Sequence, residues 1–168
     1  NISVMSGSHI TCWMNTNHTN YLDITGSGDL RMRYAADKLS MTGRYTIAQG
    51  EMKYSLPVIP LKTFTISEDS YIEFTGDIMN PRLNITATEK NRATVTEDGQ
   101  SRTVEFTCGV AISKTLQDMG LEFIISAPED QQTNDALSRM SMEERGKLAV
   151  TMLTTGMYLA DTNTAGVT

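Results

Sequence analysis

The sequence predicts an all-β protein, a mostly antiparallel sheet followed by one short helix. Apolar and polar side chains alternate from the N-terminal end almost to residue 127, and this period of two is typical of strands that bury one face. Clusters of Gly, Asn, Asp and Pro divide the alternating runs at short intervals, as expected for successive hairpins. A helical period begins only at Ser141.

The clearest strand is V-E-F-T-C-G-V-A-I-S, residues 104–113. Its even-numbered side chains are apolar and its odd-numbered ones are mostly small or polar, so one face is expected to be buried. The same alternation is visible earlier, at Ile10, Cys12, Met14, Leu22, Ile24, Leu30, Met32 and Tyr34. The candidate site residues on the apolar face are Leu39, Met41, Tyr45, Ile47, Met52, Tyr54, Phe64, Ile66, Ile72, Phe74, Leu83, Ile85, Val104, Phe106, Val110, Ile112, Leu121, Phe123 and Ile125.

Turn-forming residues predict where the strands end. The expected turns are T-G-S-G-D at 25–29, A-Q-G-E at 48–51, S-E-D-S at 67–70, M-N-P-R at 79–82 and E-D-G-Q at 97–100. In L-P-V-I-P-L, neither Pro57 nor Pro60 can donate a ladder hydrogen bond, so this segment is expected to be a bulge, a sheet edge or a loop.

The helical segment carries its own start and stop signals. Ser141 and Glu144 have the spacing of a capping box, in which the side chain of each residue accepts a hydrogen bond from the backbone amide of the other. Apolar residues at i and i+4, such as Leu148 and Met152, predict one buried face, to which Leu153 also belongs, and Gly156 is a plausible stop. A short amphipathic helix of this kind is expected to dock on another surface.

The residues leave open how the apolar face of the sheet is covered. Two sheets packed as a sandwich, a closed barrel, and a long sheet curled into a half-pipe are all compatible with the pattern. The 11 methionines suit a lining for variable apolar guests, and they suit a gap-filling core equally well.

Charge and length exclude several functions. The formal net charge is −6 and the sequence pI is about 4.9, so neither nucleic-acid binding nor adhesion through a polybasic patch is expected. No apolar run reaches the roughly 18–20 residues of a membrane-spanning helix. No signal peptide is recognisable at the first residues, N-I-S-V-M-S-G-S, and we expect the chain to be a piece of a longer protein.

No residue pattern indicates catalysis or a metal. His9 and His18 lie in polar stretches without the partners of a triad, and no Cys-x-x-Cys or Cys/His cluster is present. Cys12 and Cys108 are each in register with the apolar face, and whether they form a disulfide depends on whether their strands are neighbours. We therefore expect no enzyme, no cofactor and no metal.

Four longer runs carry a resemblance to a known family. They are G-R-Y-T-I-A-Q-G-E-M-K-Y at 43–54, Y-I-E-F-T-G-D-I-M-N-P-R-L-N-I-T-A-T-E at 71–89, V-A-I-S-K-T-L-Q-D-M-G-L-E-F-I-I-S-A-P-E-D at 110–130 and M-S-M-E-E-R-G-K-L-A-V-T-M-L-T-T-G at 140–156. In this order the runs resemble the C-terminal domain of the TamB family, the translocation and assembly module, over roughly residues 28–160.

The resemblance implies a β-taco, a long curled antiparallel sheet with an open hydrophobic trough. Residues 1–130 would then form the trough and residues 131–168 a C-terminal tail with the short helix. The candidate apolar residues would line the trough, and Leu148, Met152 and Leu153 would dock the helix on a partner. The partners implied are phospholipid acyl chains and an Omp85-type outer-membrane β-barrel protein, with bilayer contact only through regions outside this chain.

Function and location follow as expectations from the same resemblance. The chain would be the periplasmic part of a protein anchored in the inner membrane of a Gram-negative envelope, guiding phospholipid between the inner and outer membranes. One alternative is chaperone-like capture of nascent β-barrel or autotransporter strands by β-augmentation. A third is a purely structural β-solenoid or adhesin spacer.

Overall fold

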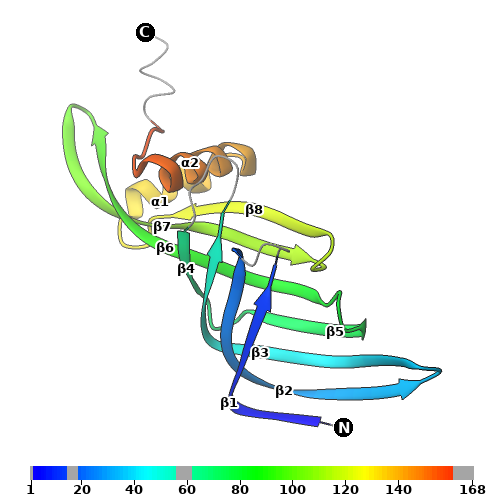
Figure 1. Cartoon of the computed structure of the whole chain (residues 1–168). Coiled ribbons are helices and arrows are strands. Elements are labelled where there is room, and N and C mark those ends of the chain that lie inside the picture. Colours follow the sequence, from blue (N-terminus) through cyan, green and yellow to red (C-terminus); the bar gives the residue numbers. More distant parts are fainter. Residues whose placement is uncertain (1, 15–18, 56–61, 161–168) are drawn as a thin grey trace. The chain divides into compact units, whose positions relative to one another are not determined.

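The predicted class is confirmed: the chain forms an antiparallel sheet followed by helices (Figure 1). This computed structural model describes residues 2–14, 19–55 and 62–160. Within these residues eight strands pair in the order β1-β2-β3-β4-β6-β7-β8, and β5 pairs with both β3 and β6. The strands are β1 (Ile2–Trp13), β2 (Tyr21–Ala35), β3 (Lys38–Tyr54), β4 (Lys62–Ile66), β5 (Tyr71–Asp77), β6 (Arg82–Glu97), β7 (Gln100–Lys114) and β8 (Met119–Ser126).

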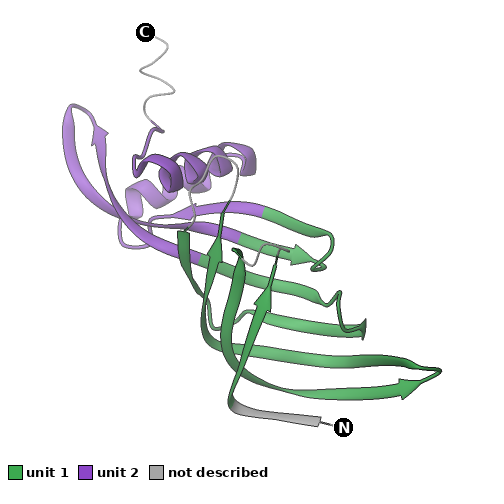
Figure 2. Cartoon of the chain, in the orientation of Figure 1, with its two compact units in different colours: residues 1–55, 61–87, 111–121 green, residues 56–60, 88–110, 122–168 purple. Residues whose placement is uncertain are grey.

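The chain divides into two compact units (Figure 2). Unit 1 comprises residues 1–55, 61–87 and 111–121, and unit 2 comprises residues 56–60, 88–110 and 122–168. β6, β7 and β8 contribute residues to both units. The first helix, α1 (Gln131–Ser138), lies wholly in unit 2, and the division at residue 130 into a trough and a tail stays a prediction.

Two of the predicted turns are wrong, because they are bends inside long strands of unit 1. Residues 25–29 lie within β2, and residues 48–51 lie within β3. Both strands bend along their length in Figure 1 and continue beyond the bend. Gly-rich segments therefore curve the strands here, and the strands are fewer and longer than the turn signals predict.

A β-bulge accompanies the bend. Thr25 pairs with Gln49, whereas the next residue of β2, Gly26, pairs with Ile47, so Ala48 is the extra residue. One extra residue exchanges the two faces of a strand. The buried side chains of β3 accordingly change from odd to even numbers; they are Tyr45, Ile47, Met52 and Tyr54.

Glycine is required at the bend because the neighbouring backbone comes very close. A Cβ atom on Gly26 would lie 2.0 Å from the carbonyl oxygen of Thr46, and one on Gly28 would lie 2.1 Å from that of Arg44. Any side chain at these positions would collide with backbone, which cannot rotate away as a flexible side chain can.

The other predicted turns are confirmed, and the β2–β3 and β7–β8 turns were missed. Residues 67–70 separate β4 from β5, residues 79–82 lead into β6, and Asp98 with Gly99 forms the two-residue loop between β6 and β7. In the missed β7–β8 turn the Asp118 amide donates to the Thr115 carbonyl oxygen at 3.2 Å. The missed β2–β3 turn runs through Ala36 and Asp37, whose φ angles are 53° and 60°. A type I′ hairpin needs positive φ at both central positions, and here no glycine signals it.

Unit 2 contains the helices, one predicted and one missed. α2 (Met142–Thr155) begins at the N-cap Ser141, which accepts a hydrogen bond from the Glu144 amide at 3.1 Å, and it ends at Gly156 with φ 75°. These bounds confirm the predicted helix. α1 was missed because its apolar period is short; it starts at Asp130, whose side chain caps the helix by accepting from the Thr133 amide.

Neither Cys12 nor Cys108 forms a disulfide: Cys108 is buried and Cys12 is half-buried, and burial raises the pKa of Cys12. The prediction for Pro57 and Pro60 lies outside the described residues. No helix among the described residues is both long and apolar enough to span a bilayer.

Candidate functional site

The candidate site residues lie mostly on buried apolar faces, described here unit by unit. Those that are buried are Tyr45, Ile47, Met52, Tyr54, Phe64, Ile66, Ile72, Leu83, Ile85, Val104, Phe106, Val110, Ile112 and Ile125. Met41, Phe74 and Phe123 are half-buried, and Leu39 and Leu121 are exposed. On the strands, the buried apolar residues absent from that set are Leu22, Ile24, Leu30, Ala87, Ala93, Val95 and Cys108.

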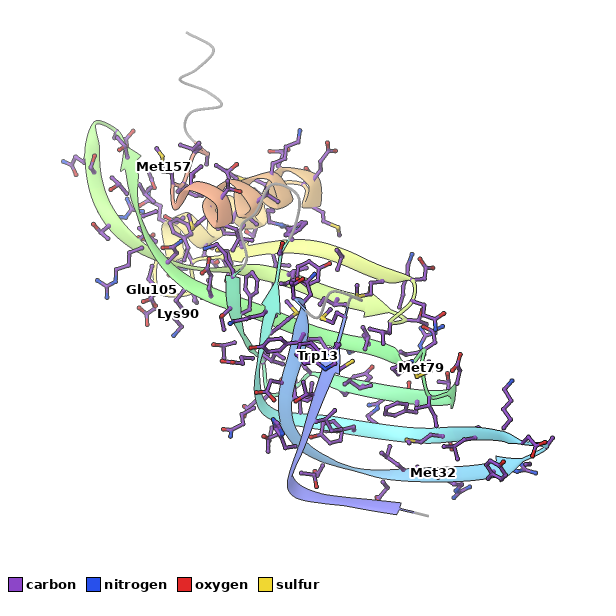
Figure 3. The ribbon with its side chains drawn as sticks, viewed as in Figure 1. Trp13, Met32, Met79, Lys90, Glu105 and Met157 are labelled. Carbon is purple, nitrogen blue, oxygen red and sulfur yellow. The ribbon has the colours of Figure 1, made fainter. Side chains whose placement is uncertain are left out.

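In unit 1 the apolar row of β2 passes from the interior to solvent. Leu30 is 8% exposed, Met32 is 40% exposed and Tyr34 is 70% exposed, all with the same strand parity. Across the hairpin, Met32 pairs with Met41 and Tyr34 pairs with Leu39, so these four side chains share one face at the end of the hairpin. Figure 3 shows Met32 near this end. We call Met32, Tyr34, Leu39 and Met41 the hairpin patch.

A buried tyrosine anchors the inner part of unit 1. The Tyr45 hydroxyl donates to the carbonyl oxygen of Ser8 at 2.6 Å, which satisfies a polar group that would otherwise be costly to bury. Burial raises the pKa of Tyr45, so the hydroxyl stays protonated and keeps its role as donor.

One groove of unit 1 is lined mainly by polar residues. It measures about 630 Å³, and a hydrogen bond joins His9 to Asp23 at its wall. Its lining is His9, Asp23, Thr25, Ala48, Gln49, Gly50, Glu51, Thr65, Ile66 and Glu68. Among the described residues no group of three or more His, Cys, Asp or Glu side chains could hold a metal. Of the candidate apolar residues, Ile66 alone is part of this lining.

In unit 2 the apolar face of β7 is covered by the chain itself. Phe106 is fully buried, and its ring stacks on Tyr158 with 4.6 Å between centroids and 27° between planes. Leu148, Met152 and Leu153, the predicted docking residues, are also buried within this unit. Docking of these side chains on another protein would therefore require α2 to leave its position.

A charged cluster joins α1 to the strands of unit 2, and no sequence signal pointed to it. The Arg102 guanidinium donates to Asp130 at 2.8 and 3.0 Å, to Glu97 at 3.0 Å and to Thr133 at 3.1 Å. Gln132 of α1 also donates to Glu97. We call Glu97, Arg102, Asp130 and Thr133 the Arg102 cluster. It connects the β6–β7 hairpin to the first turn of α1.

The cluster shifts the pKa of two of its members, Asp130 and Arg102. Hydrogen bonds from Arg102 first, and from the Thr133 amide, hold the pKa of Asp130 well below its usual range. A hydrogen bond to Asp130 in turn raises the pKa of the Arg102 guanidinium. Asp130 and Arg102 are therefore both ionised at neutral pH.

Replacing Asp130 with asparagine is expected to lower the free energy of unfolding by about 1 kcal/mol at neutral pH, because asparagine keeps the cap but loses the charge. Since the folded-state pKa of Asp130 is depressed, its contribution is present above the ordinary value of 3.8 and is lost as pH falls below it. Urea denaturation of both proteins over this range checks the prediction, and a stability difference that stayed constant with pH would contradict it.

One comparison with known proteins gives a match. A family model described as the TamB C-terminal domain matches residues 9–167. No curated protein and no solved structure gives a significant match. The family match covers nearly the whole chain, and it includes both units and both helices.

Proposed function

The chain belongs to the TamB C-terminal domain family, and we propose that its apolar strand faces guide phospholipid acyl chains between the inner and outer membranes. The family acts in outer-membrane biogenesis in the periplasm, as a transport and assembly module. Lipid as the cargo, the β-taco trough as its path, and the absence of any catalytic role are our proposals.

One observation supports lipid as the cargo: the hairpin patch of unit 1 continues a buried apolar row out to solvent. Leu30, Met32 and Tyr34 become more exposed step by step along one face of β2. Each methylene of an acyl chain that leaves water is favoured by about 0.8 kcal/mol. A graded apolar row of this kind gives an acyl chain a place to make its first contact.

The proposed setting follows from the family. We propose that the chain lies in the periplasm as part of a protein that is anchored in the inner membrane through a region outside this sequence. We further propose an Omp85-type outer-membrane β-barrel as its partner. The net charge of −6 favours neither a polybasic membrane contact nor a nucleic-acid partner.

Photo-crosslinking tests the proposal at the hairpin patch. The photoreactive amino acid p-benzoylphenylalanine is placed at Leu39, which is 45% exposed and so tolerates replacement, in the protein expressed in a Gram-negative cell. Ultraviolet irradiation followed by mass spectrometry is expected to give phospholipid adducts at this position. Arg33 provides the matched control, because it is exposed on the opposite face of the same hairpin and pairs with Ser40.

The two positions separate the outcomes. Phospholipid adducts at Leu39 and few at Arg33 support a lipid path along the apolar face. Equal labelling of the two faces, or adducts with proteins alone at Leu39, would contradict the proposal.

A second candidate, capture of client β-strands, is favoured by the ends of the sheet. In the described part of the chain, β1 pairs with β2 alone and β8 pairs with β7 alone in the strand order. A terminal strand of this kind can add an extended peptide by backbone hydrogen bonds. The same photoreactive residue at Glu122, an exposed position of β8, is expected to capture β-barrel proteins if this function holds.

A further inference from the structure

The apolar face of β7 in unit 2 is covered by a segment that could be replaced by another apolar body. α2 contributes four buried side chains, Leu148, Ala149, Met152 and Leu153. The backbone of α2 passes close to β8, since a Cβ atom on Gly146 would lie 3.9 Å from the carbonyl oxygen of Phe123. After the helix ends, Tyr158 stacks on Phe106 of β7. We call residues 142–158 the cover.

The cover and α1 are held in different ways. α1 is fixed to the strands by the charged hydrogen bonds of the Arg102 cluster, at 2.8–3.1 Å. The polar contacts of α2 are made within the helical segment: Glu143 with Lys147, Glu144 with Ser141, and Arg145 with the carbonyl oxygen of Leu137. The buried side chains that α2 presents are apolar, and Tyr158 adds an aromatic stack on Phe106; contacts of this kind are ones that an acyl chain can replace.

The cover is also a weak helix by composition. Gly146 lies in its interior, and Thr151, Thr154 and Thr155 occupy its last turns, where glycine and β-branched residues lower helix propensity. A helix of 14 residues is marginal in isolation, so α2 depends on its packing against the strands. Loss of that packing is expected to loosen α2 while α1 stays tied to the strands by Arg102.

We propose that the cover is a displaceable lid, and that an acyl chain takes its place on the apolar face of β7, against Val104, Phe106 and Val110. This inference rests on the proposed function and adds its regulation: the face is closed until a lipid arrives. The apparent affinity for the lipid is then the affinity of the open form multiplied by the fraction of molecules in which the lid is open. Each methylene that becomes buried recovers about fourfold in affinity.

Removing the aromatic contact of the lid tests the inference. The full chain is titrated with dansyl-labelled undecanoic acid, and binding is followed by dansyl fluorescence. Tyr158→Ser removes the stack on Phe106, so the lid opens more often, and the probe is expected to bind about three- to tenfold more tightly than to the wild type. Met157→Ser is the matched control, because Met157 is the neighbouring residue and is 53% exposed (Figure 3); its affinity is expected to equal that of the wild type.

Hydrogen exchange of the wild-type chain gives an independent reading that needs no variant. Saturation with the probe is expected to speed exchange of the α2 amides, while the amides of β7 stay protected. This measurement decides the question even where Tyr158→Ser fails to fold, which circular dichroism would reveal.

The outcomes distinguish the lid from the proposed function. The lid is overturned if the probe binds to the wild type, binds Tyr158→Ser with the same affinity, and leaves the α2 amides protected. In that case an apolar path elsewhere, such as the hairpin patch, remains. If no acyl probe binds to the wild type or to Tyr158→Ser, and Leu39 captures no phospholipid, both the lid and the proposed function are overturned.

Discussion

Phe106→Ala is expected to lower the free energy of unfolding by about 3–5 kcal/mol. Phe106 is 0% exposed, and its ring contacts Tyr158 in a stack with 4.6 Å between centroids. The substitution loses the burial of the ring, leaves a cavity beneath α2 and removes the aromatic contact. Urea denaturation followed by far-ultraviolet circular dichroism measures the change.

Phe74→Ala is the matched control for this prediction. Phe74 is also a phenylalanine on the apolar side of a strand, but it is only half-buried, so its replacement is expected to cost clearly less. Equal losses for the two variants would mean that the face of β7 is no more tightly packed than the partly open end of unit 1. In that case the cover would not bury the face of β7 enough to act as a lid.

Local signals in the sequence sufficed for the helix that was predicted. The N-cap Ser141, the acidic first turn at Glu143 and Glu144, and the αL residue Gly156 all act within one or two turns of the chain. Such contacts can be read from spacing alone. α1 was missed because its apolar period is short, although its N-cap Asp130 bonds locally to the Thr133 amide. The contact that ties α1 to the strands, from Arg102 to Asp130, joins residues 28 apart in sequence, and no spacing rule predicts it.

Strand parity predicted which side chains face inward, and it could not predict what they face. Val104, Phe106 and Val110 are buried as their alternation indicates. Their cover comes from α2 and Tyr158, and the packing of a helix on a sheet depends on tertiary contacts that a period of two does not contain. The residue pattern therefore left open what covers the apolar face, and in unit 2 the chain itself contributes to the covering through Tyr158.

Glycine was the most misleading signal, because it serves two purposes in this chain. At Gly99, with φ 78°, it forms the hairpin turn that the sequence predicts. At Gly26 and Gly28 it permits a bend in a continuous strand, where the next strand comes close. The two uses look alike in sequence, since both place glycine between apolar runs.

Gly26→Ala is expected to lower the free energy of unfolding by at least about 3 kcal/mol, at the upper end for an overpacked site. The added Cβ atom would lie 2.0 Å from the carbonyl oxygen of Thr46, and neither strand can yield without losing the pairing around the bulge. Trp13 is the single tryptophan of the chain and packs edge-on against Tyr21 at the start of β2. Its fluorescence during urea denaturation therefore reports on this part of unit 1.

Gly146→Ala is the control that isolates the clash from a general effect of replacing glycine. Its Cβ atom meets only the carbonyl oxygen of Phe123, at 3.9 Å, and alanine in a helix interior is favoured over glycine by up to about 1 kcal/mol. This variant is expected to be more stable than the wild type, while Gly26→Ala is much less stable. If Gly26→Ala were as stable as the wild type, β2 and β3 would be able to move apart at the bend, and the close approach of their backbones would not be what requires glycine there.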